Sequence, residues 1–291
     1  MKHFWHHSAS SFFRRAFSLI EIMVTVALLS VIILGLVAMF DQTRRAFTSS
    51  ITQVDVLESG RDATALIAQQ MEQMAASSIS TGVNFFVETP STAPPMTQAL
   101  VDPSDVRTNI LQDVFFLTRL NQTWTGVGYK VFNSGGTTGG SLGTLYRYAG
   151  VNIPATNGFL IGQQWTNFNL GAPGTNFTRI VDGVVDFTIR AYDTNGNLYP
   201  FITTFPSIST NYLFPLQSSW YYRFTSNSLP AYVEVELGVL EDRTLARYQA
   251  IAGPANINLT AANNYLADHP GQVHVFRQRI PIRNVSSAAY Q

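Results

Sequence analysis

Cysteine is absent from the 291-residue sequence, and lysine occurs only as Lys2 and Lys130. Without cysteine, the chain forms neither a disulfide framework nor a thiolate site. Lysine plus arginine and aspartate plus glutamate are balanced at 18 each, and charged residues make up only 12% of the chain. This composition gives no indication of the basic surface that binds nucleic acid.

Charge is also missing from one long segment near the amino terminus. The 19 residues Ile22–Phe40 contain no charged side chain, and a helix of this length is roughly 28 Å long, close to the thickness of the bilayer hydrocarbon. A cleaved secretory signal or a plain anchor is the alternative, but residues 35–47, "GLVAMFDQTRRAF", contain no small-residue cleavage pair. Lys2, Arg14 and Arg15 precede the segment and favour a cytoplasmic leader.

A single carboxylate, Glu21, stands directly before this apolar run. A carboxylate at the edge of the hydrocarbon is costly and persists when it has a partner. The alternative is that Glu21 simply extends to the lipid headgroups.

The residues around Glu21 resemble the amino terminus of the type IV prepilins and pseudopilins. That pattern is a short basic leader, a small residue, a phenylalanine, and a glutamate at the fifth mature position before about twenty apolar residues. Ala16, Phe17 and Glu21 occupy these positions, with Ala16 in place of the usual glycine. The resemblance implies that prepilin peptidase cleaves after Ala16, that the new terminus is N-methylated at Phe17, and that Glu21 pairs with the α-amino group of a neighbouring subunit.

The helical pattern continues beyond the membrane segment. Apolar or small residues recur at spacings of three and four, at Phe47, Ile51, Val54, Leu57, Gly60, Ala63, Ile67, Met71 and Met74. No proline occurs in residues 17–78. We therefore predict one helix about 90 Å long, which follows the leader over 1–16 that the resemblance implies. Its first half, 17–41, lies in the membrane or filament core, and its amphipathic half, 42–78, packs on a domain.

The remaining chain predicts an antiparallel β-rich domain over 111–291. Residues 79–110 are rich in Ser, Thr and Pro and predict a linker loop. Alternation predicts strands at 113–120, 126–133, 143–150, 183–193, 231–240 and 273–282. Residues 193–197, "DTNGN", predict a hairpin turn. The expected fold is α+β and pilin-like, with a long helix packed on an antiparallel sheet.

The carboxyl-terminal half resembles the J-type minor pseudopilins of type II secretion and the W-type minor pilins more weakly. The segments that carry this resemblance are "TLYRYAG", "RIVDGVVDFTIRAYDTNGNLYP", "LPAYVEVELGVLED" and "HVFRQRIPIRN", in that order. They are short and apolar, and their order carries most of the weight.

Three patterns are considered as chemical sites and rejected. Ser141 lies in "GGSLG", which has the spacing of a nucleophile elbow but leads into a predicted strand rather than a helix. Asp268, His269 and His274 lack the spacing of a metal motif. The turn at 193–197 has too few carboxylates for a calcium loop. We predict no enzyme, no metal and no cofactor.

Aromatic residues gather before and within residues 220–224. Trp220, Tyr221, Tyr222 and Phe224 form a partner-binding patch if they are exposed, and the alternative is packing beneath an insertion.

The resemblance thus implies a structural subunit of a type II secretion or type IV pilus-like filament. The alternative is a pilus-borne adhesin or ligand-binding minor pilin. The resemblance implies prepilin peptidase and other pilins as partners, with secreted cargo or an outer-membrane pore as further candidates. The expected location is the inner membrane, crossed once, with the globular domain in the periplasm, followed by a periplasmic or cell-surface filament.

Overall fold

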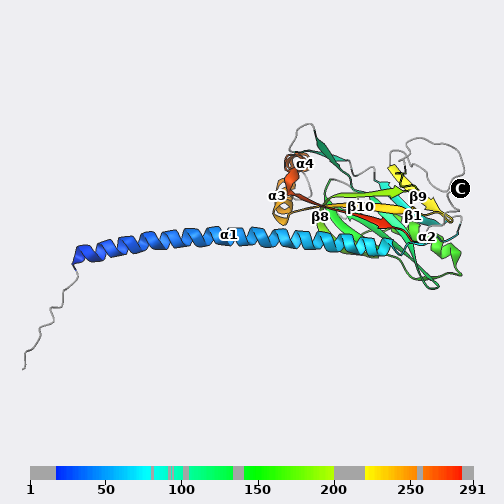
Figure 1. Cartoon of the computed structure of the whole chain (residues 1–291), viewed down its shortest axis with the longest axis horizontal. Coiled ribbons are helices and arrows are strands. Elements are labelled where there is room, and N and C mark those ends of the chain that lie inside the picture. The colour runs from blue at the N-terminus through cyan, green and yellow to red at the C-terminus, as the bar shows by residue number, and fades with distance from the viewer. Residues whose placement is uncertain are drawn as a thin grey trace, which may run out of the picture. The chain divides into compact units, whose positions relative to one another are not determined.

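The computed structural model describes residues 18–79, 82–90, 93, 95–100, 105–133, 141–199, 220–253 and 258–283. The chain forms two compact units, residues 1–51 and 52–291 (Figure 1). Its elements are α1 Leu19–Met71, β1 Val83–Thr89, β2 Met96–Ala99, β3 Val106–Asn109, β4 Asp113–Leu120, β5 Thr123–Phe132, β6 Gly143–Ala149, β7 Ile153–Pro154, α2 Gly158–Leu170, β8 Phe177–Tyr192, β9 Trp220–Thr225, β10 Tyr232–Leu240, α3 Asp242–Ala252, α4 Leu259–Ala267, a 3₁₀ turn Pro270–Gln272, and β11 Val273–Pro281.

The first unit contains the apolar part of α1, which begins at Leu19. Every side chain from Ser18 to Thr48 is exposed, and by length and composition this helix is able to cross a membrane. Its few polar side chains bond back to the helix, since Thr25 Oγ1 donates to the Ile22 carbonyl and Ser30 Oγ to the Val26 carbonyl, at 2.9 and 2.8 Å. The segment therefore presents an apolar surface without unsatisfied hydroxyl groups.

The second unit contains the rest of α1, and only part of the predicted apolar stripe is buried there. The helix residues that enter the core are Val56, Ala63, Ile67, Ala68 and Met71. Val54 and Leu57 of this unit are exposed and do not enter its core. Phe47 and Ile51, which belong to the first unit, are exposed as well.

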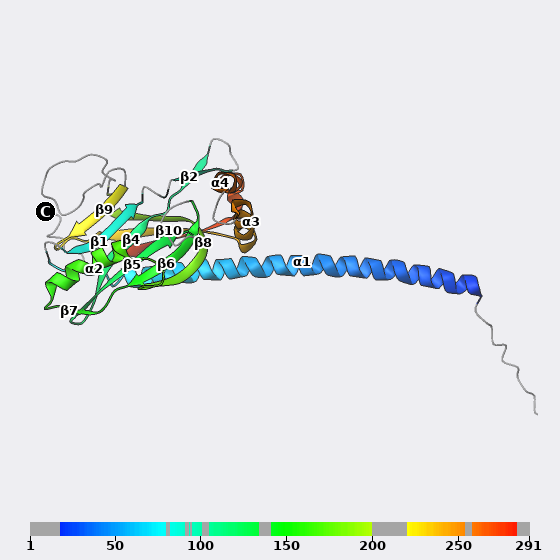
Figure 2. The ribbon, with the colours of Figure 1, turned by 180° about the vertical axis from the view of Figure 1, so that it is seen from behind.

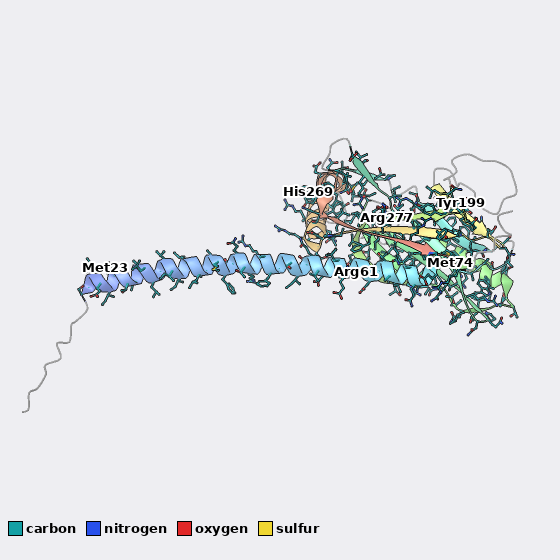
Figure 3. The ribbon with its side chains drawn as sticks, in the orientation of Figure 1. Met23, Arg61, Met74, Tyr199, His269 and Arg277 are labelled. Atoms are coloured by element: carbon teal, nitrogen blue, oxygen red, sulfur yellow. The ribbon has the colours of Figure 1, made fainter. Side chains whose placement is uncertain are left out.

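The helix also ends at Met71 rather than continuing to residue 78. The Met74 backbone forms a β-bridge with Thr118, and the Ala75 amide donates to the Leu117 carbonyl at 3.0 Å. The chain exchanges helical hydrogen bonds for sheet hydrogen bonds at this point, and Met74 lies where α1 reaches the sheet (Figure 3).

The main sheet has nine strands in the order β11-β10-β8-β6-β5-β4-β1-β9, with β7 paired to β5. All of its pairings between named strands are antiparallel. The six predicted strands are present as β4, β5, β6, β8, β10 and β11. In β10 the valines are buried, while Glu234 and Glu236 lie on the other face.

The predicted linker over 79–110 contains strands instead. β1 pairs with β4 and β9 in the main sheet, and β2 pairs with β3 in a two-stranded sheet. The first five residues of β1 are buried regardless of which face they occupy, so the strand has no polar alternation to reveal it. The linker prediction is therefore corrected by the structure.

The sheet lies between two helices, as β5 demonstrates. Val127, Tyr129 and Val131 face the core that contains α1. Gly126 and Gly128 approach Gln164 and Phe168 of α2 on the opposite face. Figure 2 shows α2 beside this part of the sheet. The architecture is α+β and pilin-like, with a long helix and an antiparallel sheet, as predicted.

A third cluster joins the small sheet to α3 and α4, which lie together in Figure 1. Met96, Leu240, Tyr248 and Leu266 are buried in it. At the end of β8, the Asp193 carboxylate accepts hydrogen bonds from the Asn195 and Asn197 amides at 2.9 and 2.7 Å. Gly196 has φ +82° there, so the predicted turn is confirmed.

Candidate functional site

The candidate site is the beginning of α1, where Glu21 lies in the first helical turn. The Glu21 amide donates to the Ser18 carbonyl at 3.0 Å and to Ser18 Oγ at 3.3 Å. Ser18 and Glu21 have the spacing of a capping box, in which the serine begins the helix and the glutamate lies at its third position. A negative side chain in the first turn also favours the helix dipole. Sequence reasoning missed Ser18, although the S-x-x-E spacing could have revealed it.

The residues before and after Glu21 in α1 carry apolar side chains. Leu19, Ile20, Ile22 and Met23 are between 53% and 77% exposed, and Met23 projects from the helix in Figure 3. Among the described residues, no ion pair reaches Glu21. Such a surface requires a surrounding apolar medium, either lipid or the helices of other chains. Ala16 and Phe17 lie outside the described residues.

Residues 13–37 match the family model of the prokaryotic N-terminal methylation motif. This match supports the type IV prepilin and pseudopilin family. No curated protein and no solved structure matches the chain. The pilin-like motif includes Ala16, Phe17 and Glu21, and it implies processing by prepilin peptidase and assembly with other pilins.

The proposed aromatic patch is not a surface feature at the residues whose side chains are described. Tyr222 and Phe224 are 2% and 1% exposed. The Tyr222 hydroxyl donates to the Tyr199 carbonyl at 3.1 Å, and the Phe224 ring packs edge-on against Phe85 at 5.7 Å. Burial raises the pKa of Tyr222. These two residues belong to the core, which corrects the patch hypothesis for them.

The other two members of that hypothesis remain untested. Trp220 and Tyr221 have a described backbone in β9, where they pair with Thr89 and Glu88 of β1. Their side chains lie outside the described residues.

The structure shows the surroundings of Ser141, His269 and His274, which belong to the sequence motifs rejected above as chemical sites. Ser141 is buried and precedes β6, so the strand-turn-helix context of a nucleophile elbow is missing at this serine. His269 Nδ1 lies 2.6 Å from the Tyr265 carbonyl, and His274 Nε2 lies 3.2 Å from Glu241 Oε1. Within the described part of the chain, no three His, Asp or Glu side chains gather as metal ligands.

A row of three charged residues, of which Lys130 and Asp113 are buried, was missed by sequence reasoning. Lys130 on β5 and Asp113 on β4 form an ion pair of 3.2 Å, with side chains 5% and 4% exposed. Glu88 on β1 lies opposite Asp113 in the strand register. Burial raises the pKa of Asp113 to about 6, and burial together with the Asp113 charge raises the pKa of Glu88 to about 7. The available signal was a solitary lysine within an apolar strand.

Proposed function

We propose that this chain is a structural subunit of a filament of the type IV pilus or type II secretion kind. The observation that carries the proposal is the methylation motif at residues 13–37, which opens an apolar helix with a fully exposed surface. A helix of this kind buries its surface in the inner membrane first and against neighbouring helices after assembly. The order of segments in the carboxyl-terminal half favours a minor subunit of the J or W type.

Processing follows from the same motif. Prepilin peptidase removes residues 1–16, the new amino group of Phe17 is methylated, and the globular domain lies in the periplasm. The boundaries 17–41 for the membrane half and 42–71 for the rest of α1 fit this arrangement. Secreted cargo and an outer-membrane pore are the partners expected of a secretion filament.

Glu21 is assigned the assembly role. Its carboxylate accepts the charged amino terminus of a neighbouring subunit, so that two charges in an apolar medium neutralise each other. An intermolecular pair of this kind also sets the axial position of one subunit against the next. The local hydrogen bonds with Ser18 hold the first turn of the helix, and they leave the carboxylate exposed to a neighbour.

The test is intact-mass and amino-terminal analysis of the full chain expressed with and without a prepilin peptidase. We expect an N-methylated chain that begins at Phe17, and we expect Ala16→Leu to prevent this cleavage. An uncut leader, or a cut after Phe40, contradicts the proposal.

Filament assembly tests Glu21 separately. Glu21→Gln is expected to be cleaved normally but to enter filaments at least tenfold less efficiently, measured by co-purification with sheared filaments. Asp41→Asn is the matched control, since it also neutralises an exposed acid on α1, and it should assemble like the unaltered chain. Equal assembly of Glu21→Gln and the control would contradict the ion-pair role.

A further inference from the structure

Glu88, Asp113 and Lys130 form one row across three adjacent strands. Glu88 lies opposite Asp113 in the β1–β4 register. The neighbouring β4–β5 pair, Val114 with Tyr129, places Asp113 beside Lys130. The separation of 3.2 Å between Lys130 Nζ and Asp113 Oδ2 is short enough for the amine to approach the carboxyl carbon.

The surroundings of this row are poor in charge. The helix α2 covers the amine: Lys130 Nζ lies 4.6 Å from the centre of the Phe168 ring and donates to the Asn169 carbonyl at 3.3 Å. Residues 158–170 of α2 contain no charged side chain, and β6 places Tyr146 opposite Lys130. Among the described residues, the charged groups that interact with the amine are Asp113 from β4 and Glu88 from β1.

An apolar enclosure disfavours a separated ammonium and carboxylate. Transfer of one proton from Lys130 to Asp113 converts the ion pair into a neutral amine beside a neutral acid. Burial raises the pKa of Asp113 to about 6 and that of Glu88 to about 7, which moves both carboxyl groups toward their protonated forms. A neutral amine is a nucleophile, and a protonated carboxyl group is the better electrophile.

We propose that Lys130 and Asp113 join in an intramolecular isopeptide bond, with Glu88 as the proton carrier. Lys130 Nζ attacks Asp113 Cγ, and an N–C bond forms as the protonated Glu88 carboxyl gives its proton to an Asp113 oxygen. Glu88 then takes a proton from the new ammonium and delivers it to the departing hydroxyl. The C–O bond breaks and one water leaves, and the remaining hydroxyl passes its proton back to Glu88 as the amide carbonyl forms. Glu88 is then protonated again, as at the start, and no oxidant or cofactor is needed.

The bond ties β4 to β5 covalently in a chain that has no cysteine for a disulfide. It also removes two buried charges at once. The bond concerns the sheet alone and does not depend on the proposed filament role.

The test is the intact mass of the full chain purified in its folded state. The bonded precursor is lighter than its sequence by one water, and the bonded processed chain is lighter by one water than residues 17–291 with the N-methyl group included. Trypsin does not cleave after a bonded lysine, so a denaturing digest should contain a branched peptide that joins residues 108–119 to residues 120–147. If the folded protein has its full mass and trypsin cleaves normally after Lys130 in the denaturing digest, the proposal is overturned and the two residues form only an ion pair.

Variants separate chemistry from folding. Lys130→Met and Asp113→Ala should have full mass, whereas Asp113→Asn should reach the same final mass as the bonded protein, because the amide releases ammonia to form the same bond. Glu88→Gln should retain the near-ultraviolet circular dichroism of the fold while bond formation slows at least tenfold. Glu234→Gln, on another strand of the sheet, is the control and should bond normally. An unchanged rate in folded Glu88→Gln contradicts the proton-carrier role.

Discussion

Replacing Gly60 with alanine tests how closely α1 packs on the sheet. A Cβ atom at Gly60 would lie 2.5 Å from Cζ and 2.7 Å from Cδ2 of Phe276 on β11, where ordinary contacts begin near 3.4 Å. Phe276 is paired with Leu237 of β10, so its backbone cannot retreat without disturbing the sheet. Overpacking of this kind costs roughly 1–3 kcal/mol.

A second effect has the opposite sign. Alanine in a helix interior is more favourable than glycine by about 0.5–1 kcal/mol. We therefore expect Gly60→Ala to lower the free energy of unfolding by about 0.5–2 kcal/mol in the natural background. In a Phe276→Ala background the clash is gone, and the same change should stabilise the protein by about 0.5–1 kcal/mol.

The assay is a double-mutant cycle from urea unfolding of the detergent-solubilised chain, followed by tryptophan fluorescence. The two effects of Gly60→Ala should differ in sign, with a coupling energy of at least about 1 kcal/mol. An equal effect in both backgrounds would refute the contact between Gly60 and Phe276.

Two further changes address buried polar groups. Asn84→Ala should lower the free energy of unfolding by about 2–4 kcal/mol, because Asn84 Oδ1 accepts a hydrogen bond from the Ser77 amide at 2.9 Å and Asn84 Nδ2 donates to the Ser226 carbonyl at 2.6 Å. Asn167→Ala, at an exposed position, should change the melting temperature little, and equal shifts in the two variants would contradict this prediction. Burial raises the pKa of Glu236, but hydrogen bonds from Arg190 and Arg277 lower it further, so the pKa lies below its usual 4.5. The stabilisation that the ionised Glu236 provides is present above pH 4.5 and is lost as the pH falls below that value. The melting temperature of Glu236→Gln should therefore fall less steeply with decreasing pH than that of the natural protein. Identical slopes of melting temperature against pH would count against the pairing of Glu236 with Arg190 and Arg277.

Patterns that are local in the sequence predicted structure well. The alternation in β10 is visible because its glutamates face a polar surface while its valines face the core. The methylation motif is likewise contiguous, so the order of residues alone is enough to name the Ala16, Phe17 and Glu21 positions. Their roles in cleavage, methylation and assembly stay predictions.

Patterns that depend on pairing could not be predicted. Phe85 and Phe86 of β1 are both buried because α1 and α2 cover opposite faces of the sheet, and this removes the alternation that marks a strand. The helix α2 was missed as well; it begins after Asn157, whose side chain caps the Leu160 amide at 3.2 Å. The Glu88, Asp113 and Lys130 row needs the register of three strands, which spacing along the chain does not give.

The enclosure of Lys130 has a practical consequence for labelling. Residues 17–291 contain a single lysine, and its side chain is 5% exposed, so reagents directed at primary amines should find little to modify on the folded globular domain. The full-length precursor offers its α-amino group and Lys2, both within the first 16 residues. Amine-reactive dyes would therefore follow the fate of the leader, and cross-linkers meant to capture neighbouring molecules should target carboxylates or arginines instead.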